Sequence, residues 1–316
     1  MPHPLAGQPA PSDVLIDVDA SAETHPALDA ALRVAKHCAA TVKIVDVLED
    51  VPPGAREYVS PQLEADLVSH RREQLVAIAR RITDVGATTD VLRGRPATAL
   101  IREILRSGHD LLVRSHGRTP DARSKQFGPI DMELLRQCPC PVWLAGLQKQ
   151  HGAPHRILAA VHANPDDPAE QGLNSSIMEL ALMMTELLGG RLSIIQAWTA
   201  FGETLLASHM PPHELKEYIE STRAREHQAF LALTQSFSDR LADATIEFVK
   251  GEAEDVIPKY VDAHEIDLVV MGTVARTGIV GLLIGNTAER VLQRLRVSVL
   301  ATKPAGFKSP VTANDE

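Results

Sequence analysis

The sequence predicts an α/β protein made of two tandem doubly wound domains, each with a five-stranded parallel sheet. Short apolar runs, typical of strands buried on both faces, alternate with amphipathic segments at helical spacing. The chain has 316 residues, which suits two domains because ~150 residues is a typical domain size. The pattern of the first half begins again in the second half, which indicates an internal repeat.

The first half is expected to alternate strands and helices along its whole length. Its predicted strands are Asp13–Asp19, Thr41–Leu48, Thr88–Leu92, Asp110–Arg114 and Val142–Ala145. Its predicted helices are Pro26–Cys38, Pro61–Asp84, Ala97–Ser107 and Gly128–Gln137. The strands are apolar or β-branched runs, and the helices carry apolar residues on one face.

The second half repeats this order. Its predicted strands are Ile157–Val161, Arg191–Ala197, Thr245–Val249, Leu268–Met271 and Val297–Thr302. Its predicted helices are Ser175–Leu188, Pro212–Ala242, Ala253–Ala263 and a last helix that begins at Asn286. Four matched pairs lie 157 residues apart, namely Gly94 with Gly251, Asp110 with Asp267, Gly128 with Gly285 and Val142 with Val299. Earlier in each half Val14 matches Ile157, at a spacing of 143, so the two copies differ in loop length.

These patterns divide the chain into segments. We expect domains at residues 13–148 and 153–307, joined by the polar linker Gly146–Pro154. Residues 1–12 are predicted to be a flexible leader without the basic and apolar regions of a signal peptide, and residues 308–316 a flexible tail.

Composition narrows the class of function. The net charge of −9 and the aromatic content of 3% argue against nucleic-acid partners. No apolar run reaches the ~18 residues of a membrane helix, so we expect a cytoplasmic protein without membrane partners. The three cysteines are too few for a disulfide framework. Cys138-Pro139-Cys140 is too tight for a relaxed disulfide and is interpreted as small residues that lead into a buried strand.

The stretch Asp267–Arg290 carries the clearest chemistry. A buried strand is followed by a segment with four glycines and then by a helix, for which Asn286 is the predicted N-cap and Glu289 the capping-box partner. Glycines let backbone N–H groups approach a phosphate, and a helix N-terminus favours negative charge. The spacing matches neither a Walker A motif nor G-x-G-x-x-G, so the sequence indicates an anion site of another type.

This stretch resembles the nucleotide loop of universal stress proteins, G-x2-G-x9-G-[S/T]. The chain has Gly272, Ala275 and Gly285 at the three glycine positions, followed by Asn286-Thr287. It is similar to the tandem, E-type members of the family from about Asp13 to Phe307. Ala275 and Asn286 depart from the pattern.

The resemblance implies a strand order of 3-2-1-4-5, a ligand crevice at the carboxyl ends of strands 1 and 4, and ATP, possibly with Mg²⁺, as the cofactor. The phosphates would be held by Gly272, Thr273, Arg276, Gly285, Asn286 and Thr287. Gly251 and His162 would lie near the base. The fifth strands of the two halves would pair within one chain, giving an internal pseudo-dimer, and whole chains could pair again as a homodimer.

The halves are chemically unequal. Pro129 in the first half matches Asn286 and removes one backbone donor from the helix start, so its phosphate loop is predicted to be degenerate. The family's base-reading aspartate corresponds to Asp19 in the first half but to His162 in the second.

The sequence therefore predicts a cytoplasmic stress-response protein that binds ATP or a related phosphorylated ligand in its second domain. One alternative is an amphipathic ligand such as a lipid-linked sugar nucleotide, because Ile279, Val280, Leu282, Leu283 and Ile284 make the loop apolar. Another is a ligand-free interaction scaffold. Catalysis would amount at most to slow ATP hydrolysis, since the loop offers neither a general base nor an activated nucleophile. No sequence motif indicates a metal site.

Overall fold

The protein is built around one β-sheet. The structure is a computed structural model that describes residues 10–115, 127–146, 154–164, 168–273 and 285–313. In the first half the strands are β1 (Asp13–Asp17), β2 (Thr41–Leu48), β3 (Ala87–Arg93), β4 (Leu111–Ser115) and β5 (Val142–Ala145). In the second half they are β6 (Arg156–Ala160), β7 (Arg191–Trp198), β8 (Thr245–Lys250), β9 (Leu268–Gly272) and β10 (Ser298–Thr302).

The order of these strands in the sheet is β3-β2-β1-β4-β5-β10-β9-β6-β7-β8. Each half therefore has the order 3-2-1-4-5, which confirms the expected topology. Neighbouring strands run parallel within each half, and β5 pairs antiparallel with β10 where the halves meet.

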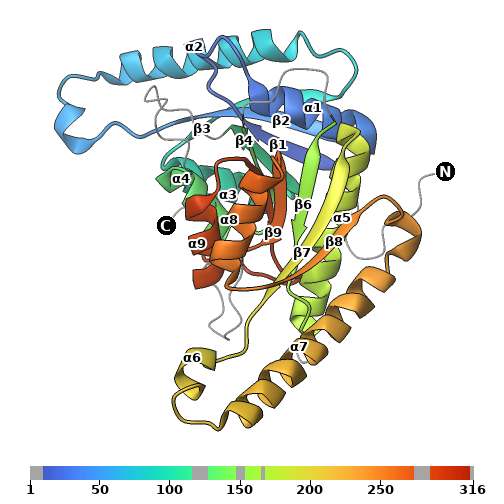
Figure 1. Ribbon diagram of the computed structural model, residues 1–316. Helices are drawn as coiled ribbons and strands as arrows, with labels where there is room; N and C mark the ends of the chain where they lie inside the picture. Colours follow the sequence, from blue (N-terminus) through green and yellow to red (C-terminus); the bar gives the residue numbers. More distant parts are fainter. Residues whose placement is uncertain (1–9, 116–126, 147–153, 165–167, 274–284, 314–316) are drawn as a thin grey trace.

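Helices cover both faces of the sheet (Figure 1). They are α1 (Pro26–Cys38), α2 (Pro61–Ala79), α3 (Pro96–Ser107), α4 (Pro129–Gln137), α5 (Pro168–Leu188), α6 (Glu203–Leu206), α7 (Pro212–Gln235), α8 (Ala253–Ala263) and α9 (Asn286–Arg294), with 3-10 turns at Pro53–Ala55 and Ser238–Arg240. Buried residues of α1, α2, α5 and α7 pack in one core, and those of α3, α4, α8 and α9 pack in the other. Each core runs through both halves.

The predicted helix boundaries were wrong in three places. α2 ends at Ala79 instead of Asp84, because its buried face ends at Ile78 and the next residues form a turn. α5 begins at Pro168 rather than Ser175, with proline in the first turn, where its missing N–H costs nothing. α7 ends at Gln235 instead of Ala242, and the four-residue helix α6 is too short to leave a periodic pattern in the sequence.

The two halves join symmetrically at β5 and β10. The paired residues are Leu144 with Val299, Trp143 with Leu300, and Val142 with Ala301. Leu300 is the residue 157 positions after Trp143, so each of these two residues pairs with its own counterpart. The pseudo-two-fold axis therefore passes through this pair, as expected for an internal pseudo-dimer.

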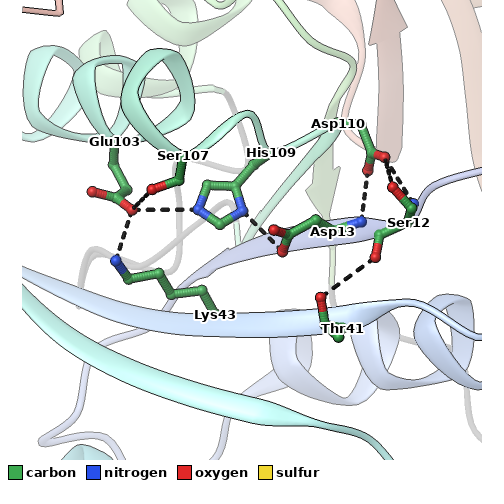
Figure 2. A network of polar contacts seen from close by, with 8 residues as sticks. All are labelled: Ser12, Asp13, Thr41, Lys43, Glu103, Ser107, His109 and Asp110. Atoms are coloured by element: carbon green, nitrogen blue, oxygen red, sulfur yellow. Dashed lines mark hydrogen bonds and ion pairs between the residues drawn. The ribbon is translucent and has the colours of Figure 1, made fainter.

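A network of polar side chains holds the amino ends of β1 and β2 in place through hydrogen bonds and ion pairs in the first half (Figure 2). The His109 ring lies between Asp13 (Nδ1 to Oδ1, 3.0 Å) and Glu103 (Nε2 to Oε1, 3.4 Å). Lys43 and Ser107 each donate to Glu103 Oε1 at 2.7 Å. Burial by itself raises the pKa of Glu103, but these hydrogen bonds and the charge of Lys43 outweigh it and hold the pKa below its usual value.

This network predicts a pH-dependent contribution to stability. The folded-state pKa of Glu103 is depressed, so its stabilising effect is present above the unfolded-state pKa and is lost as the pH falls through the folded-state value. Glu103→Gln should lower the melting temperature at pH 7, and the difference from the wild type should vanish at acid pH, when both side chains are neutral. Melting curves followed by circular dichroism between acid and neutral pH test this.

Asp84→Asn is the matched control. Asp84 forms a solvent-exposed pair with Lys36 at 2.7 Å, which water screens. Asp84→Asn should therefore change the melting temperature at pH 7 much less than Glu103→Gln does. An equal change for both variants would contradict the assigned role of the buried network.

Candidate functional site

The second half contains a cavity of about 620 Å³ at the carboxyl ends of its strands. Its wall includes the last residues of β6, β7, β8 and β9 or those just after them, together with the first turn of α9. In an open α/β sheet this edge, between the first and fourth strands, is where ligands bind. The location matches the expected crevice.

The N-terminus of α9 opens into this cavity. Asn286, Thr287 and Ala288 form its first turn and line the cavity wall. Backbone N–H groups in the first turn of a helix lack intrahelical acceptors, and the helix dipole adds partial positive charge. This end of the cavity is therefore suited to an anion.

The capping of α9 differs from the sequence prediction. Gly285 is the N-cap, Asn286 is the first helical residue, and no side chain caps the helix. Glu289, the predicted capping-box partner, instead pairs with Arg136 of α4 across the junction between the halves. The prediction was wrong because Glu289 has a stronger, charged partner that is distant in sequence.

Two glycines shape the cavity by leaving out a side chain. Gly251, at the end of β8, has φ +143°, and a Cβ there would lie 2.8 Å from Val256 Cγ2. A Cβ on Gly272 would lie 2.7 Å from Leu173 Cδ2 of α5. Both positions therefore require glycine, or a shift of the neighbouring side chain.

His162 follows β6 and lines the same cavity as the α9 N-terminus. Asn174 of α5 fixes the backbone of His162 by accepting its N–H (2.9 Å) and donating to its carbonyl (2.7 Å). Trp198, at the end of β7, lines the same cavity and stacks on Phe248 with ring centroids 5.7 Å apart. An aromatic ring and an imidazole in the wall of one cavity suit a flat, polar-edged ligand group.

The structure brings most of the predicted site residues together. Six line the cavity: His162, Gly251, Gly272, Gly285, Asn286 and Thr287. Thr273 does not, because it is fully buried and its hydroxyl donates to the Leu135 carbonyl of the first half at 3.1 Å. The Thr273 side chain is thus part of the junction. Arg276 lies outside the described residues.

Sequence reasoning missed several residues of the wall. The described wall is largely apolar, and its acidic members are Glu170, Glu226 and Glu252; no lysine or arginine occurs among the described lining residues. A second cavity of about 410 Å³ adjoins the first and shares His162, Thr199 and Glu226 with it. Asn174 and Trp198 carry no motif, and nothing in the sequence alone distinguishes them.

In the first half a buried ionic triad lies at the corresponding place. Arg114 of β4 pairs with Asp17 of β1, and its Nε donates to Asp131 Oδ1 of α4 at 2.9 Å. All three residues are at most 8% exposed. Asp131 Oδ2 also accepts the Gly128 N–H at 3.0 Å. The chain's own carboxylate therefore occupies the α4 N-terminus, where an anion would bind.

Strand register gives the counterparts of this triad in the second half. Asp17 pairs with Arg114 across β1 and β4, as Ala160 pairs with Met271 across β6 and β9. Ala288 lies 157 residues after Asp131. Ala160, Met271 and Ala288 all line the cavity, so three uncharged side chains leave open the space that the triad fills in the first half.

The contacts after the carboxyl ends of β1 and β6 differ in the same way. In the first half Asp46 Oδ2 accepts the Ala20 N–H at 2.9 Å and also pairs with Arg71, which contacts Asp19 as well. In the second half Gln196 Oε1 accepts the matching Ala163 N–H at 2.9 Å. The hydrogen bond is the same in both halves, but its acceptor is a carboxylate in the first half and a neutral amide in the second.

Among the described residues no group of three or more His, Cys, Asp or Glu side chains is arranged to hold a metal ion. Within the same part of the chain no helix is both long and apolar enough to cross a membrane.

The chain is similar to known proteins along nearly its whole length. The model of the universal stress protein family matches it twice, at residues 12–146 and 153–303. Universal stress protein E of Escherichia coli K12 is 27% identical over 314 residues, covering 96% of this chain and 98% of that protein. A universal stress protein E homolog of Haemophilus influenzae is 30% identical over 218 residues, covering 68% of this chain and 69% of that protein.

Solved structures show the same fold. A functionally unknown protein from Pseudomonas aeruginosa PAO1 superposes with a TM-score of 0.65 at 26% identity and covers 94% of both chains. A universal stress protein from Archaeoglobus fulgidus superposes with a TM-score of 0.61 at 15% identity, covering 92% of this chain and 98% of that one. The duplicated 3-2-1-4-5 sheet and the double family match establish that the chain belongs to the universal stress protein family, as a tandem member.

Proposed function

We propose that the chain is a cytoplasmic stress-response protein that binds ATP or a related phosphorylated ligand in the cavity of its second half. One contrast carries the proposal. The α9 N-terminus faces a cavity of about 620 Å³, whereas the matching α4 N-terminus is occupied by Asp131. A position that one half fills with its own carboxylate suits an external anion in the other half.

The dimensions of the cavity and two of its lining residues, His162 and Trp198, support a nucleotide-like ligand. Ligand pockets usually measure roughly 300–1,000 Å³. With the phosphates at Asn286 and Thr287, the base would lie towards His162 and Trp198, which line the same cavity. Mg²⁺ would be carried mainly by the phosphates, since this ion prefers phosphate oxygens and retained waters to an all-protein cage.

Changing the charge at Thr287 tests the position of the phosphates. Thr287 is exposed and lies in the first turn of α9, where a carboxylate is compatible with the helix dipole. Thr287→Glu should weaken ATP binding at least about tenfold, which is ~1.4 kcal/mol, because like charges repel near the α9 N-terminus. Isothermal titration with ATP, with and without Mg²⁺, measures this.

Thr287→Gln is the matched control, since it has the same size without the charge. It should bind ATP within about threefold of the wild type. Equal losses for both variants would indicate a steric effect and would count against phosphates at this position. No heat of binding for the wild-type protein at millimolar ATP would remove the nucleotide from the proposal.

Transplanting the first-half triad should close the cavity. In the triple variant Ala160→Asp, Met271→Arg, Ala288→Asp, the new carboxylate at position 288 is expected to occupy the α9 N-terminus as Asp131 occupies that of α4. ATP binding should be lost, while the far-ultraviolet circular dichroism stays that of the wild type. Titration calorimetry on the folded variant checks the loss.

The reverse triple variant, Asp17→Ala, Arg114→Met, Asp131→Ala, is the matched control in the first half. It should leave ATP binding in the second half intact. Loss of binding in the reverse variant but not in the transplant would place the ligand in the first half and overturn the proposal.

An amphipathic ligand is the second candidate. Apolar side chains make up most of the described wall, including Leu173, Ile177, Ile257 and Val291. Native mass spectrometry of freshly purified protein distinguishes the two candidates. An amphipathic ligand should remain bound through purification and appear as added mass, which unfolding in organic solvent removes. Unmodified mass, together with ATP binding in solution, favours the nucleotide.

A further inference from the structure

A buried cluster of two thiols and one amine lies at the junction between the halves, outside the cavity wall. Cys138 is the C-cap of α4, Cys140 precedes β5, and Lys303 follows β10. The Sγ atoms of Cys138 and Cys140 are 3.6 Å apart. Cys138 is 0%, Cys140 8% and Lys303 6% exposed. In the register that pairs Ala301 with Val142, Lys303 falls opposite Cys140.

The fold does not require this chemistry. The counterparts of Cys138 and Cys140, 157 residues later, are Leu295 and Val297, and the counterpart of Lys303 is Gly146. Leu295 is 1% exposed and packs in the core, so apolar side chains satisfy the same positions in the other half. Packing alone therefore does not explain why this cluster has two thiols and a buried cation when its counterpart has none of them.

The environment favours one reactive thiol of the two. Burial opposes ionisation of Cys138, but the hydrogen bond from Cys140 and the nearby charge of Lys303 outweigh it, so the pKa of the Cys138 thiol lies below its usual value. The hydrogen bond to Cys138 and burial raise the pKa of Cys140 well above its usual value. Burial lowers the pKa of Lys303, whose Nζ also lies 5.1 Å from the Phe307 ring centre.

We propose that Cys138 and Cys140 form a reversible dithiol–disulfide pair that hydrogen peroxide oxidises, with Lys303 as the cation that stabilises the Cys138 thiolate and protonates the departing hydroxide. The Cys138 thiolate attacks one peroxide oxygen. An S–O bond forms, the O–O bond breaks, and the departing hydroxide takes a proton from Lys303 and leaves as water. The Cys140 sulfur then attacks the Cys138 sulfur. The S–S bond forms, the S–O bond breaks, and the second hydroxide leaves as water with the Cys140 proton.

In the overall reaction two thiols lose two electrons and one peroxide becomes two waters. The Sγ atoms must approach by ~1.5 Å, because a disulfide bond measures about 2.05 Å. The tight Cys-Pro-Cys ring makes the product strained and thus easily reduced, which suits a reversible oxidation. Loss of the thiolate also removes the negative partner of Lys303, which can then remain buried as a neutral amine.

Peroxide treatment of the folded, reduced full-length chain tests the proposal. After alkylation of the remaining thiols, peptide mass spectrometry should find Cys138 joined to Cys140, with Cys38 still reduced. Cys38 is an internal reference thiol, since its pKa is raised by burial. Dithiothreitol should restore both thiols. In Cys140→Ser, dimedone should trap a sulfenic acid on Cys138.

Lys303 is tested separately. Lys303→Met should slow disulfide formation about tenfold and move the pH profile of Cys138 alkylation to higher pH, because the thiolate loses its cation. Lys303→Arg should restore the pH profile of Cys138 alkylation, because it keeps the positive charge, but not the full rate of disulfide formation, because a guanidinium does not give up a proton. A folded Lys303→Met variant with an unchanged pH profile would show that Lys303 acts only in packing.

The double variant Cys138→Leu, Cys140→Val copies the counterpart residues and serves as the unreactive control. It should fold, as judged by circular dichroism, and should not form the disulfide. Oxidation of Cys38 in the wild type before the pair, oxidation of the pair only to irreversible acids, or equal dimedone labelling of Cys140 in Cys138→Ser would each overturn the proposal.

Discussion

The antiparallel pairing of β5 with β10 is the constraint on which the rest of the structure depends. A five-stranded half-sheet on its own would expose the hydrogen-bonding groups of its fifth strand, an edge prone to unwanted pairing. Here each half covers the other's edge, and Trp143 meets its own counterpart Leu300 at the axis. Both hydrophobic cores then run without a break through the two halves. The two halves therefore share one sheet and two continuous cores, and are not joined by the linker alone.

This constraint also decides which residues are available for a ligand. The junction brings α4 beside α9, and it uses side chains that local sequence would assign to the nucleotide loop. Thr273 donates to the Leu135 carbonyl of the other half, and Glu289 pairs with Arg136. Among the described residues, the first turn of α9 still presents its backbone N–H groups to the cavity. Backbone donors suit a phosphate as well as side chains do, and they tolerate the substitution of Asn for Ser or Thr at position 286.

The two crevices illustrate how duplicated units diverge under one electrostatic requirement. A helix N-terminus beside the carboxyl end of a sheet needs a negative partner or water. In the first half Asp131 supplies that partner, and Arg114 with Asp17 completes a buried group whose members depend on each other. Removing one member would leave an uncompensated buried charge, which typically costs about 3–5 kcal/mol. Each member therefore depends on the other two, and the second half has uncharged residues at all three counterpart positions.

Features of the fold and the site that depend on residues close together in sequence could be predicted, whereas those that depend on distant residues could not. The alternation of strands and helices and the internal register depend on local periodicity and on matched spacing, whereas the strand order was implied by the resemblance to the family. These predictions were confirmed. The α9 cap and Thr273 failed because their partners, Arg136 and Leu135, are more than 130 residues away in sequence and no local pattern encodes them. The ionic triad was within reach: the 157-residue register aligns Arg114 with Met271 and Asp131 with Ala288, but the strand pairing was needed to join Asp17 to them.

Three consecutive residues at the end of β10, Thr302 to Pro304, belong in turn to the junction, the thiol cluster and the cavity wall. The Thr302 carbonyl accepts the Thr273 N–H at 3.2 Å, Lys303 lies opposite Cys140, and Pro304 lines the cavity. Thr273 in turn accepts the Gly285 N–H at 2.9 Å, which fixes the residue that caps α9. A displacement of this short segment would thus alter both the pairing of the halves and the position of the α9 N-terminus. In the first half Gly146 is the counterpart of Lys303, and Asp131 accepts the Gly128 N–H at the start of α4.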